Sequence, residues 1–486
     1  MFRFKKITLL AALLLIFISA NGQGGNIRKF IEKLKKDSSF VDAVAGIMVM
    51  DSKGNTVASW NPDMPLLTAS TMKTITTGIA LDLYGADHKF TTKIAHSGFI
   101  ADGVLYGDLY IVGGGDPTLG SKDTVAFPIG EVFAQWLAFI KEKGIKRING
   151  HIVADDRIFE DEPMPDSWSW SNMGTNYGST SSGLSFCENI QYFKFNTGVN
   201  IGDAVFFDSV YPEIPQMTYE NRLSTAGSRT GDRSSYYVSD LSKIGRFTGF
   251  LPAGRDSMIV SVSNKFPALS CAFEFRKYLR SNGIFSSPEI KDAKSFNAAQ
   301  ASELTIIGKS ESKELWKIVN VTNRISNNFF AETLLKHIGV KLTGVGSYDS
   351  SITAVKRYFK SKGLSLKGFT MADGSGLSRQ NYVSARFFCN YFNKMKESNT
   401  FAQFFGSLPQ PGGPGTLKNV LSYVEEKEEK ERLHAKSGSL SSVKCYAGYV
   451  VKGKETYTFA ILTNNYSSRT AVMMEGIEGL MEELIR

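Results

Sequence analysis

A serine and a lysine three positions apart form a candidate nucleophile and base. Ser70 and Lys73 are separated only by Thr71 and Met72. In a helix, residues i and i+3 lie on the same face, so the serine hydroxyl and the lysine amine would be neighbours. An apolar wall lowers the pKa of a lysine and leaves neutral amine to accept the serine proton, and a helix N-terminus stabilises the developing negative charge. The pair therefore predicts covalent catalysis by a serine.

The Ser-x-x-Lys spacing alone is weak support, because it recurs at Ser310–Lys313 and Ser441–Lys444. The first copy lies in a highly polar stretch, and the second lies on an expected strand, where positions i and i+3 face opposite sides. Only Ser70 comes before apolar residues at helical spacing that stop at a glycine, namely Met72, Ile75, Ile79 and Leu83 before Gly85. We therefore expect Ser70 to open a buried helix.

Two further polar motifs follow along the chain. Ser326-Asn327-Asn328 lies where one expected helix ends and the next begins, which is a place for exposed polar groups. Lys436-Ser437-Gly438 is the only Lys-[Ser/Thr]-Gly in the chain and precedes an expected strand, where a glycine permits close approach of another segment. Each motif alone is more often structural than catalytic. Their order and placement after Ser70 favour one shared catalytic site.

The two ends of the chain have the pattern of one α/β domain. Val44–Ser59 forms an expected hairpin, and Ser442–Asn464 forms a second one before an amphipathic helix over Ala471–Ile485. Three further helices are expected over Leu315–Ser326, Asn328–Ile338 and Ile352–Lys362. Between the two ends, glycine-rich turns alternate with β-type runs. We predict a catalytic domain of residues 23–89 and 298–486, split by a β-rich insert of one or two subdomains over residues 90–297.

The first residues have the three-part order of a secretory signal peptide. Basic residues between positions 3 and 6 precede the apolar run Ile7–Ile18 and the small and polar residues Ser19–Gly22. The apolar run is shorter than the roughly 20 residues that a spanning helix needs. We therefore expect a signal peptide over residues 1–22, cleaved after Ala20 or Gly22, and an exported periplasmic protein with at most peripheral membrane association.

Composition limits the classes of partner and cofactor. The net charge of +9 falls to about +6 once the three basic residues of the leader are removed, which is ordinary surface balance. No interleaved basic and aromatic patch predicts nucleic-acid binding. The five histidines show no HExxH spacing and the four cysteines form no CxxC, so no metal and no other cofactor is expected. Neither the disulfide pairing nor the oligomeric state follows from the sequence.

Several other residues favour a structural role. The glycines Gly113–Gly115 indicate a β-turn, because no Gly-Lys-[Ser/Thr] follows them as in a phosphate-binding loop. Trp168 and Trp170 are of a type that stacks on sugars, but core packing of the insert is the preferred interpretation. Asp373 and Ser375 are expected to shape a turn near the site.

Longer strings of residues resemble one protein family. These are Leu67–Lys73, Gly107–Leu119 with its Gly-Asp-Pro, Ile325–Leu335, Asp373–Arg379 (Asp-Gly-Ser-Gly-Leu-Ser-Arg) and Gly415–Leu417. Together they resemble the class C low-molecular-mass penicillin-binding proteins, D-alanyl-D-alanine carboxypeptidases that also cleave peptidoglycan cross-links. The resemblance covers nearly the whole mature chain. The 256 residues from Ser70 to Ser326 (326 minus 70) match the large insert of that family.

The resemblance implies an α/β fold with a penicillin-recognising serine transpeptidase-like domain, in which an antiparallel sheet is flanked by helices. It also implies that Ser70 attacks the carbonyl between the terminal D-alanines of a peptidoglycan stem peptide, with Lys73 as general base. A serine ester forms, and water then releases the acyl group. β-Lactam antibiotics would trap that ester as inhibitors.

The remaining site residues follow from the same resemblance. Ser326, hydrogen-bonded to Lys73 and Lys436, would pass a proton to the departing amine, while Asn328 would hold the backbone amide of the substrate. Substrate contacts to the terminal carboxylate are expected from the motif Lys436-Ser437-Gly438. The backbone N–H groups of Ser70 and Ser439 would form the oxyanion hole.

Two departures from the family pattern and three rival functions remain. The second motif is Ser-Asn-Asn instead of the commoner Ser-Asp-Asn, and the third is Lys-Ser-Gly instead of Lys-Thr-Gly, so an altered substrate preference is the largest effect expected. A β-lactamase would share the ester chemistry, but the long insert argues against it. An inert wall-binding protein would not need Ser70, Lys73, Ser326 and Lys436 together. A Ser-His-Asp hydrolase fits poorly, because Gly-x-Ser-x-Gly does not occur.

Overall fold

The computed structural model describes residues 24–162, 164–296 and 298–486 in two compact units. The first unit comprises the described residues up to Gly78, together with Asn323–Ser326 and Lys356–Arg486. The second comprises Ile79–Thr322 and Asn327–Val355. The predicted signal peptide lies outside the described residues. None of the described helices is long and apolar enough to cross a membrane.

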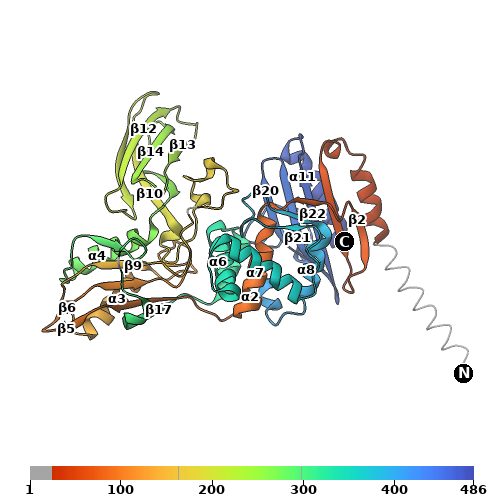
Figure 1. The fold of residues 1–486 in the computed structure, drawn as a ribbon. Coiled ribbons are helices and arrows are strands. Elements are labelled where there is room, and N and C mark those ends of the chain that lie inside the picture. Colours follow the sequence, from red (N-terminus) through yellow and green to blue (C-terminus); the bar gives the residue numbers. More distant parts are fainter. Residues whose placement is uncertain (1–23, 163, 297) are drawn as a thin grey trace, which may run out of the picture. The chain divides into compact units, whose positions relative to one another are not determined.

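A five-stranded antiparallel sheet forms the centre of the first unit (Figure 1). Both predicted hairpins belong to it, and they pair with one another through the first and last strands of the sequence. In spatial order the strands are β2 (Thr56–Trp60), β1 (Val44–Met50), β22 (Glu455–Asn464), β21 (Val443–Lys452) and β20 (Leu433–Leu440). The turn of the second hairpin contains two residues, because β21 ends at Lys452 and β22 begins at Glu455.

Helices cover both faces of this sheet. Residues 24–34 are helical and pack with α11 (Thr470–Ile485) against one face, where Ile31 and Ile477 join Ile47 and Ile461 in one buried cluster. On the other face lies α8 (Ala385–Met395), whose Phe392 carbonyl oxygen accepts a 3.0 Å hydrogen bond from the Tyr449 hydroxyl. The expected antiparallel sheet flanked by helices is thus confirmed.

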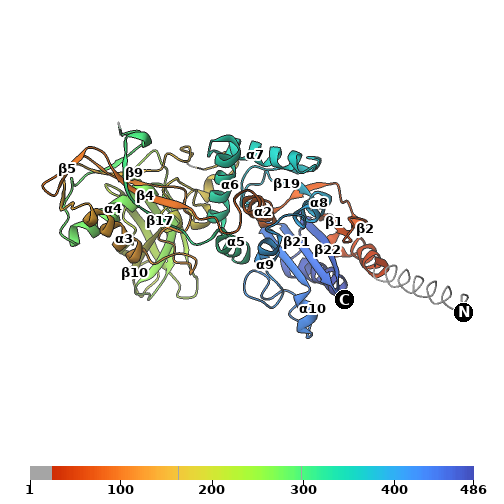
Figure 2. The same ribbon diagram turned by 90° about the horizontal axis from the view of Figure 1, so that it is seen from below.

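The helices predicted from the sequence are present with shifted ends. They are α5 (Leu315–Arg324), α6 (Asn328–Thr343), α7 (Tyr348–Ser361) and α2 (Lys73–Tyr84), and shorter helices α9 (Phe401–Ser407) and α10 (Lys427–Glu431) follow α8 (Figure 2). Helix α6 is longer than expected and ends at Gly344, which has a φ of 81°. Helix α2 stops before Gly85, as the glycine predicts.

The second unit is built on a mixed five-stranded sheet covered by two helices. Its order is β16 (Ile290–Asp292), β9 (Ile152–Asp155), β7 (Leu109–Val112), β4 (Thr91–His96) and β17 (Thr305–Glu311). Helices α3 (Ile129–Glu142) and α4 (Pro267–Ser281) pack on it, and a small sheet adds β5 (Phe99–Ala101), β6 (Val104–Tyr106) and β8 (Arg147–Ile148). The insert therefore contains two long helices beside its strands.

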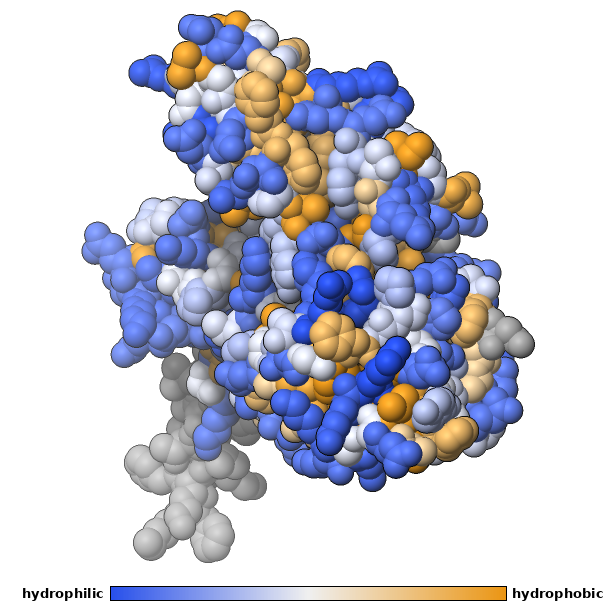
Figure 3. All heavy atoms as spheres, turned by 90° about the vertical axis from the view of Figure 1, so that its left-hand side faces the viewer, coloured by the Kyte–Doolittle hydropathy of each residue, from blue (hydrophilic) through white to orange (hydrophobic). Residues whose placement is uncertain are grey.

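A smaller all-β part of the second unit consists of two three-stranded sheets. One contains β11 (Val205–Tyr211), β10 (Ile190–Thr197) and β15 (Met258–Ser263), and the other contains β12 (Thr218–Ala226), β14 (Ile244–Pro252) and β13 (Arg233–Tyr237). Strand β10 alternates between buried and half-buried residues, so Phe193 and Phe195 meet Phe247 in a shared core. Apolar side chains also gather on the surface of this all-β part. Figure 3 shows them as an orange band at the height at which Figure 1 shows β12 to β14.

The four cysteines are buried free thiols. Cys389 lies on the buried face of α8, and Cys445 lies on β21, where its thiol donates a 3.3 Å hydrogen bond to the Leu67 carbonyl. Burial raises the pKa of both thiols to about 12, so they remain protonated at neutral pH. We assign them to packing.

Candidate active site

Ser70 lies in a single turn of 3₁₀ helix, η2 (Ala69–Met72), and the α-helix α2 begins at Lys73. The prediction that Ser70 opens a buried helix is therefore correct for the position of the helix start. The first turn, however, is a 3₁₀ turn, which is wound more tightly than an α-helix. In a 3₁₀ turn the side chains at i and i+3 eclipse one another. The Lys73 amine consequently donates a hydrogen bond of 2.9 Å to the Ser70 hydroxyl.

Lys73 is completely buried, and its amine has a second partner from a distant loop. The Nζ atom donates a 2.7 Å hydrogen bond to the main-chain carbonyl of Ser375. A buried lysine amine needs such acceptors, because an unsatisfied polar group costs about 1–3 kcal/mol or more. The carbonyl thus fixes the direction in which the amine faces Ser70.

The loop that supplies this carbonyl is organised by Asp373. Its carboxylate accepts hydrogen bonds from the backbone N–H groups of Gly376 (2.7 Å) and Ser378 (2.6 Å). The Asn381 side chain donates a further bond of 2.8 Å to it. The expected turn-shaping role of Asp373 and Ser375 is confirmed, and the turn contacts the candidate base directly.

Gly376 lets this loop touch the turn that carries Ser70. Its φ is 83°, and a Cβ added there would lie 1.8 Å from the Ala69 carbonyl oxygen. No side chain other than hydrogen fits such a contact. On the other side, the Thr76 hydroxyl donates a 2.8 Å bond to the Gly374 carbonyl. The loop is therefore fastened to both the 3₁₀ turn and helix α2.

Strand β20 brings the third motif to the same turn. Lys436, Ser437 and Gly438 are buried in the edge strand of the five-stranded sheet. A Cβ on Gly438 would lie 2.6 Å from the Thr68 carbonyl oxygen and 3.0 Å from the Ser70 backbone nitrogen. The expectation that this glycine permits close approach of another segment is confirmed, and that segment is the one holding the candidate nucleophile.

Lys436 is a second completely buried lysine in this region. Burial is the main cause that holds its pKa well below the usual range, and the positive charges of Lys73 and Lys444 lower the pKa further. Its amine donates a 2.8 Å hydrogen bond to the Ser437 carbonyl. Two amines that repel one another in a buried site favour a state in which they are not both protonated.

Ser437 is linked to the chain segment that leads to Ser326. Its hydroxyl donates a 2.9 Å bond to the Thr416 hydroxyl, and the Thr416 backbone N–H donates to the Arg324 carbonyl at 3.0 Å. Gly415 is required beside it, because a Cβ there would lie 2.6 Å from the same carbonyl oxygen. Within the first unit, Thr416 thus connects the third motif to the residues just before the second.

Ser326 lies between α5 and α6, as the sequence predicts, and it is half-buried with a φ of 63°. A left-handed conformation is unusual for a serine and costs about 1–3 kcal/mol, so the neighbouring contacts must enforce it. One such contact is made by Asn323, whose Nδ2 donates to the hydroxyls of Thr77 (3.1 Å) and Ser407 (2.8 Å). The end of α5 is therefore fixed on helix α2.

The other two residues of the second motif begin the second chain segment of the second unit, Asn327–Val355. The Asn327 Oδ1 atom caps α6 by accepting the Phe330 backbone N–H at 2.9 Å, and its Nδ2 donates to the Glu188 carboxylate at 2.7 Å. Asn328 donates a 3.0 Å bond to the Tyr177 carbonyl. An aspartate at position 327 would place a second carboxylate against that of Glu188, where the asparagine amide now donates a hydrogen bond.

Ser439 is exposed near the end of β20, and its hydroxyl accepts a 2.8 Å hydrogen bond from Lys444 on the paired strand. Arg379, from the Asp-Gly-Ser-Gly-Leu-Ser-Arg string, donates a 3.0 Å bond to the Ser441 carbonyl in the adjoining turn. The end of β20 is thus fixed from both sides. The role of the Ser439 N–H in an oxyanion hole stays a prediction.

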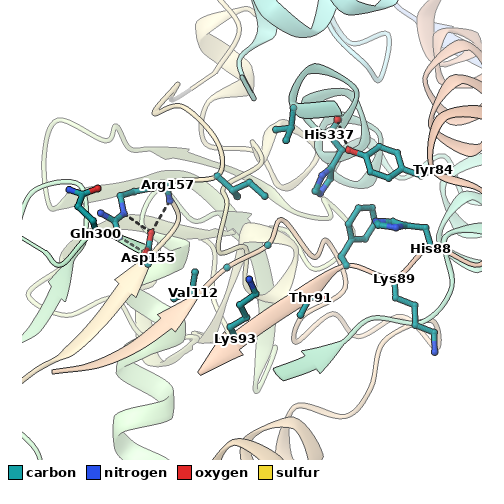
Figure 4. A pocket seen from close by; sticks show the side chains of 15 residues that line it. Tyr84, His88, Lys89, Thr91, Lys93, Val112, Asp155, Arg157, Gln300 and His337 are labelled. Carbon is teal, nitrogen blue, oxygen red and sulfur yellow. Dashed lines mark hydrogen bonds and ion pairs between the residues drawn. The ribbon is translucent and has the colours of Figure 1, made fainter. Parts of the chain in front are cut away.

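A separate pocket of about 640 Å³ lies in the second unit and contains none of the predicted site residues (Figure 4). Tyr84, His88 and His337 line one end, and the Arg157–Asp155 ion pair lines the other. His337 is buried, which lowers its pKa to about 4, so the neutral ring donates from Nε2 to the Gly115 carbonyl at 2.8 Å. These contacts are structural.

Residues 24–162, 164–296 and 298–486 contain no group of three or more His, Cys, Asp or Glu residues that could hold a metal ion. The arrangement around Ser70 instead offers a hydroxyl, two buried amines and the backbone N–H groups of a 3₁₀ turn and a strand. This combination suits acyl transfer through a serine ester.

The sequence motifs do not identify three residues that contact residues of the motifs. Thr416 lies in a string that contributed only to the family resemblance, and Glu188 lies in the insert without any motif. The carbonyl of Ser375 is a main-chain group, which carries no side-chain signal.

The two tryptophans of the insert differ in burial. Trp168 is buried as expected, but Trp170 is 63% exposed, so its expected core packing is wrong.

Curated proteins are similar to this chain over most of its length. A D-alanyl-D-alanine carboxypeptidase from an Actinomadura species is 27% identical over 456 residues, which cover 91% of this chain and 81% of that protein. The carboxypeptidase DacB of Haemophilus influenzae is 22% identical over 461 residues, with 91% and 89% coverage.

The solved structures of penicillin-binding protein 4 from Haemophilus influenzae are similar in fold. One matches with a TM-score of 0.81 at 22% identity, covering 94% of this chain and 99% of the other, and a complex with a novel β-lactam matches with a TM-score of 0.77. The penicillin-recognising fold is thereby confirmed. The model of the D-Ala-D-Ala carboxypeptidase 3 (S13) family matches residues 27–483, and the chain belongs to this family.

Proposed function

We propose that Ser70 is the nucleophile with which this serine-type D-Ala-D-Ala carboxypeptidase cleaves peptidoglycan stem peptides. Membership of the S13 family establishes the class of enzyme. The single observation that carries the assignment of the nucleophile is the 2.9 Å hydrogen bond between the Ser70 hydroxyl and the completely buried amine of Lys73. A nucleophile within hydrogen-bond reach of an oriented base is the arrangement that acyl transfer needs.

In the acylation step, Lys73 takes the Ser70 proton while the oxygen attacks the carbonyl of the penultimate D-alanine. The negative charge on the carbonyl oxygen is stabilised by the backbone N–H groups of Ser70 and Ser439, each of which contributes a factor of about 10² to 10³ in rate. Ser326 then passes a proton to the departing amine, and Asn328 holds the substrate backbone. A serine ester and a free amine result.

Lys436 and Ser437 are proposed to bind the terminal carboxylate of the substrate. Burial is the main cause that holds the pKa of the Lys436 amine well below its usual range. A carboxylate beside the amine raises this pKa and so favours the protonated form of the lysine when the substrate binds. The resulting charge-assisted contact selects peptides that end in a free carboxylate. Gly438 allows β20 to present these groups beside Ser70.

Water then attacks the ester and restores Ser70. The leaving amine is D-alanine in the carboxypeptidase reaction and the side chain of a neighbouring stem peptide in the endopeptidase reaction, with the same acylated serine in both. β-Lactams acylate the same hydroxyl, but their ring opens without releasing a separate amine. A similar structure from Haemophilus influenzae holds such a compound. The N-terminal leader supports export to the periplasm, where these substrates occur.

Release of D-alanine from a synthetic stem pentapeptide tests the proposal. Wild type is expected to release one D-alanine per peptide, and Ser70→Ala is expected to release none above background. Lys73→Met should reduce the rate by at least a factor of about 10³, because a positioned base contributes up to about 10⁴. Equal rates for wild type and Ser70→Ala would exclude Ser70 as the nucleophile.

A further inference from the structure

The all-β part of the second unit contains a groove that the proposed chemistry does not use. The groove has a volume of about 540 Å³. One wall is the segment with the short helices η3 (Trp170–Asn172) and η4 (Asn176–Gly178), and the other is formed by residues of β13 and β15. Each wall presents apolar side chains to solvent, and these are Trp170 (63% exposed), Tyr177 (51%), Tyr237 (47%) and Ile259 (59%).

The exposed rings are carried by a rigid backbone. The Gly174 carbonyl accepts the Ser263 N–H at 3.1 Å, and Thr175 forms a β-bridge with Val262 of β15. A Cβ on Gly174 would lie 1.7 Å from the Tyr236 carbonyl oxygen, so this segment lies directly against β13. Burying Trp170 would stabilise the protein by about 1.5–3 kcal/mol, and the fold nevertheless holds the ring in water.

Polar groups line the groove between the rings. They are uncharged, except for one carboxylate, and come from Ser171, Asn176, Ser234, Ser235 and Asp232. Asp232 accepts the Ser234 N–H at 2.8 Å and the Ser234 hydroxyl at 2.6 Å, which fixes this end of the groove. The Ser171 hydroxyl is held at 2.8 Å from that of Ser169. Aromatic faces thus alternate with hydroxyl and amide groups.

This wall is in direct contact with the second catalytic motif. The carbonyl of Tyr177, whose ring lines the groove, accepts the 3.0 Å hydrogen bond from Asn328. Asn328 is the last residue of Ser326-Asn327-Asn328. A polymer bound in the groove would therefore lie next to a residue that is proposed to hold the stem peptide.

We propose that the groove binds the glycan strand of peptidoglycan, to which the stem peptides are attached. Amino sugars have an apolar C–H face that stacks on an aromatic ring, and a rim of hydroxyl and acetamido groups that bind hydroxyls and amides. The single charge in the lining favours a neutral polymer over a phosphate-rich one. The identification of the polymer rests on the proposed function.

Binding to peptide-free glycan strands tests the groove independently of catalysis. Strands are prepared from peptidoglycan by enzymatic removal of all stem peptides, and the binding of full-length protein is measured by fluorescence titration. Trp170→Ala and Tyr237→Ala are each expected to weaken binding by at least fivefold, because Trp and Tyr are enriched among the few contact residues whose truncation costs more than about 1 kcal/mol. Trp170→Phe should retain most of the affinity.

Phe206→Ala provides the matched control. Phe206 is 64% exposed on β11 and lies outside the groove, so its removal should leave glycan binding unchanged. Turnover of the free synthetic pentapeptide should be unchanged in all four variants, whereas turnover of the same peptide on intact glycan should fall in the two groove alanine variants. Equal glycan affinity of wild type and the alanine variants would overturn the proposal. Loss of pentapeptide turnover in wild type, with glycan binding intact, would count against the catalytic assignment alone.

Discussion

The amine of Lys73 lies 2.7 Å from the main-chain carbonyl oxygen of Ser375, so a loop about 300 residues away in sequence orients the candidate base. The loop acts through Asp373, which touches neither Ser70 nor Lys436 in the contacts described above. Asp373 is in this sense a positioning residue. The contribution of Asp373 to the acylation rate can be separated from its contribution to stability.

Replacing Asp373 with alanine removes the acceptor of three hydrogen bonds to the loop. We expect acylation by a labelled penicillin to slow by a factor of about 10 to 100, with a loss of about 3 kcal/mol in the free energy of unfolding. Asp373→Asn keeps one acceptor and should recover part of the rate. The pH profile of acylation should shift in both variants, because the environment of Lys73 changes. Glu428→Gln on exposed α10 is the control, and an unshifted profile with a normal rate would contradict the assignment.

Gly438→Ala tests the contact between β20 and the nucleophile. The added methyl group would lie 2.6 Å from the Thr68 carbonyl oxygen, and the strand or the turn must move to accommodate it. We expect acylation to fall by at least a factor of about 10² and the unfolding free energy to fall by about 1–3 kcal/mol. Gly406→Ala is the matched control, since nothing lies within 4 Å of its added Cβ in helix α9. Equal acylation rates in the two variants would show that the close approach is unimportant.

Asn327→Asp tests why this chain departs from the usual second motif. The new carboxylate would face Glu188 at the 2.7 Å distance now bridged by the amide N–H. Like charges raise the pKa of one carboxyl group in the folded state above its unfolded value, so the folded state binds more protons. Stability should fall by about 1–2 kcal/mol at pH 7 and recover as the pH falls through the raised pKa.

The double variant Asn327→Asp with Glu188→Gln removes this repulsion and should restore stability at pH 7. Urea unfolding of the two single variants and the double variant gives the coupling energy directly. If the single and double variants have the same stability, the bond between Asn327 and Glu188 does not explain the departure from Ser-Asp-Asn.

Protonation of His337 should contribute to acid unfolding. Burial lowers the pKa of its ring to about 4 in the folded protein, against 6.5 for an ordinary histidine. Between these values the unfolded chain binds a proton that the folded protein does not, so the contribution is fully present above pH 6.5 and is lost as the pH falls toward 4. The difference corresponds to about 3 kcal/mol. His337→Gln should unfold with a shallower pH dependence in urea titrations between pH 7 and pH 4.

Much of the site could be predicted because its signals are local in sequence. The spacing from Ser70 to Lys73, the apolar period of α2 and the glycine after it need no knowledge of the rest of the fold. The two hairpins and α11 follow from alternation and period in the same way. The 3₁₀ geometry of the turn at Ser70 could not be predicted, and the reason is local. A 3₁₀ turn and an α-helical turn both place residues i and i+3 on one side, so their spacing in the sequence does not distinguish the two.

The remaining features depend on contacts between distant segments. The Lys73–Ser375 bond joins a side chain to a main-chain oxygen, and the Asn327–Glu188 bond joins the second motif to a residue of the insert that no motif marks. The sequence favours core packing for Trp170, because large aromatic residues are highly buried on average. Its neighbour Trp168 follows that rule at 5% exposure, while the fold holds Trp170 in water beside the groove.

Covalent labelling with a radioactive penicillin shows whether Ser70 forms the acyl-enzyme. Wild type is expected to bind one penicillin per chain, with the label on a peptide that contains Ser70, and Ser70→Ala is expected to bind none. Ser310→Ala and Ser441→Ala, which alter the other two Ser-x-x-Lys sequences, should label like wild type. Labelling of Ser70→Ala by penicillin would contradict the assignment, and so would a wild-type protein that is not labelled.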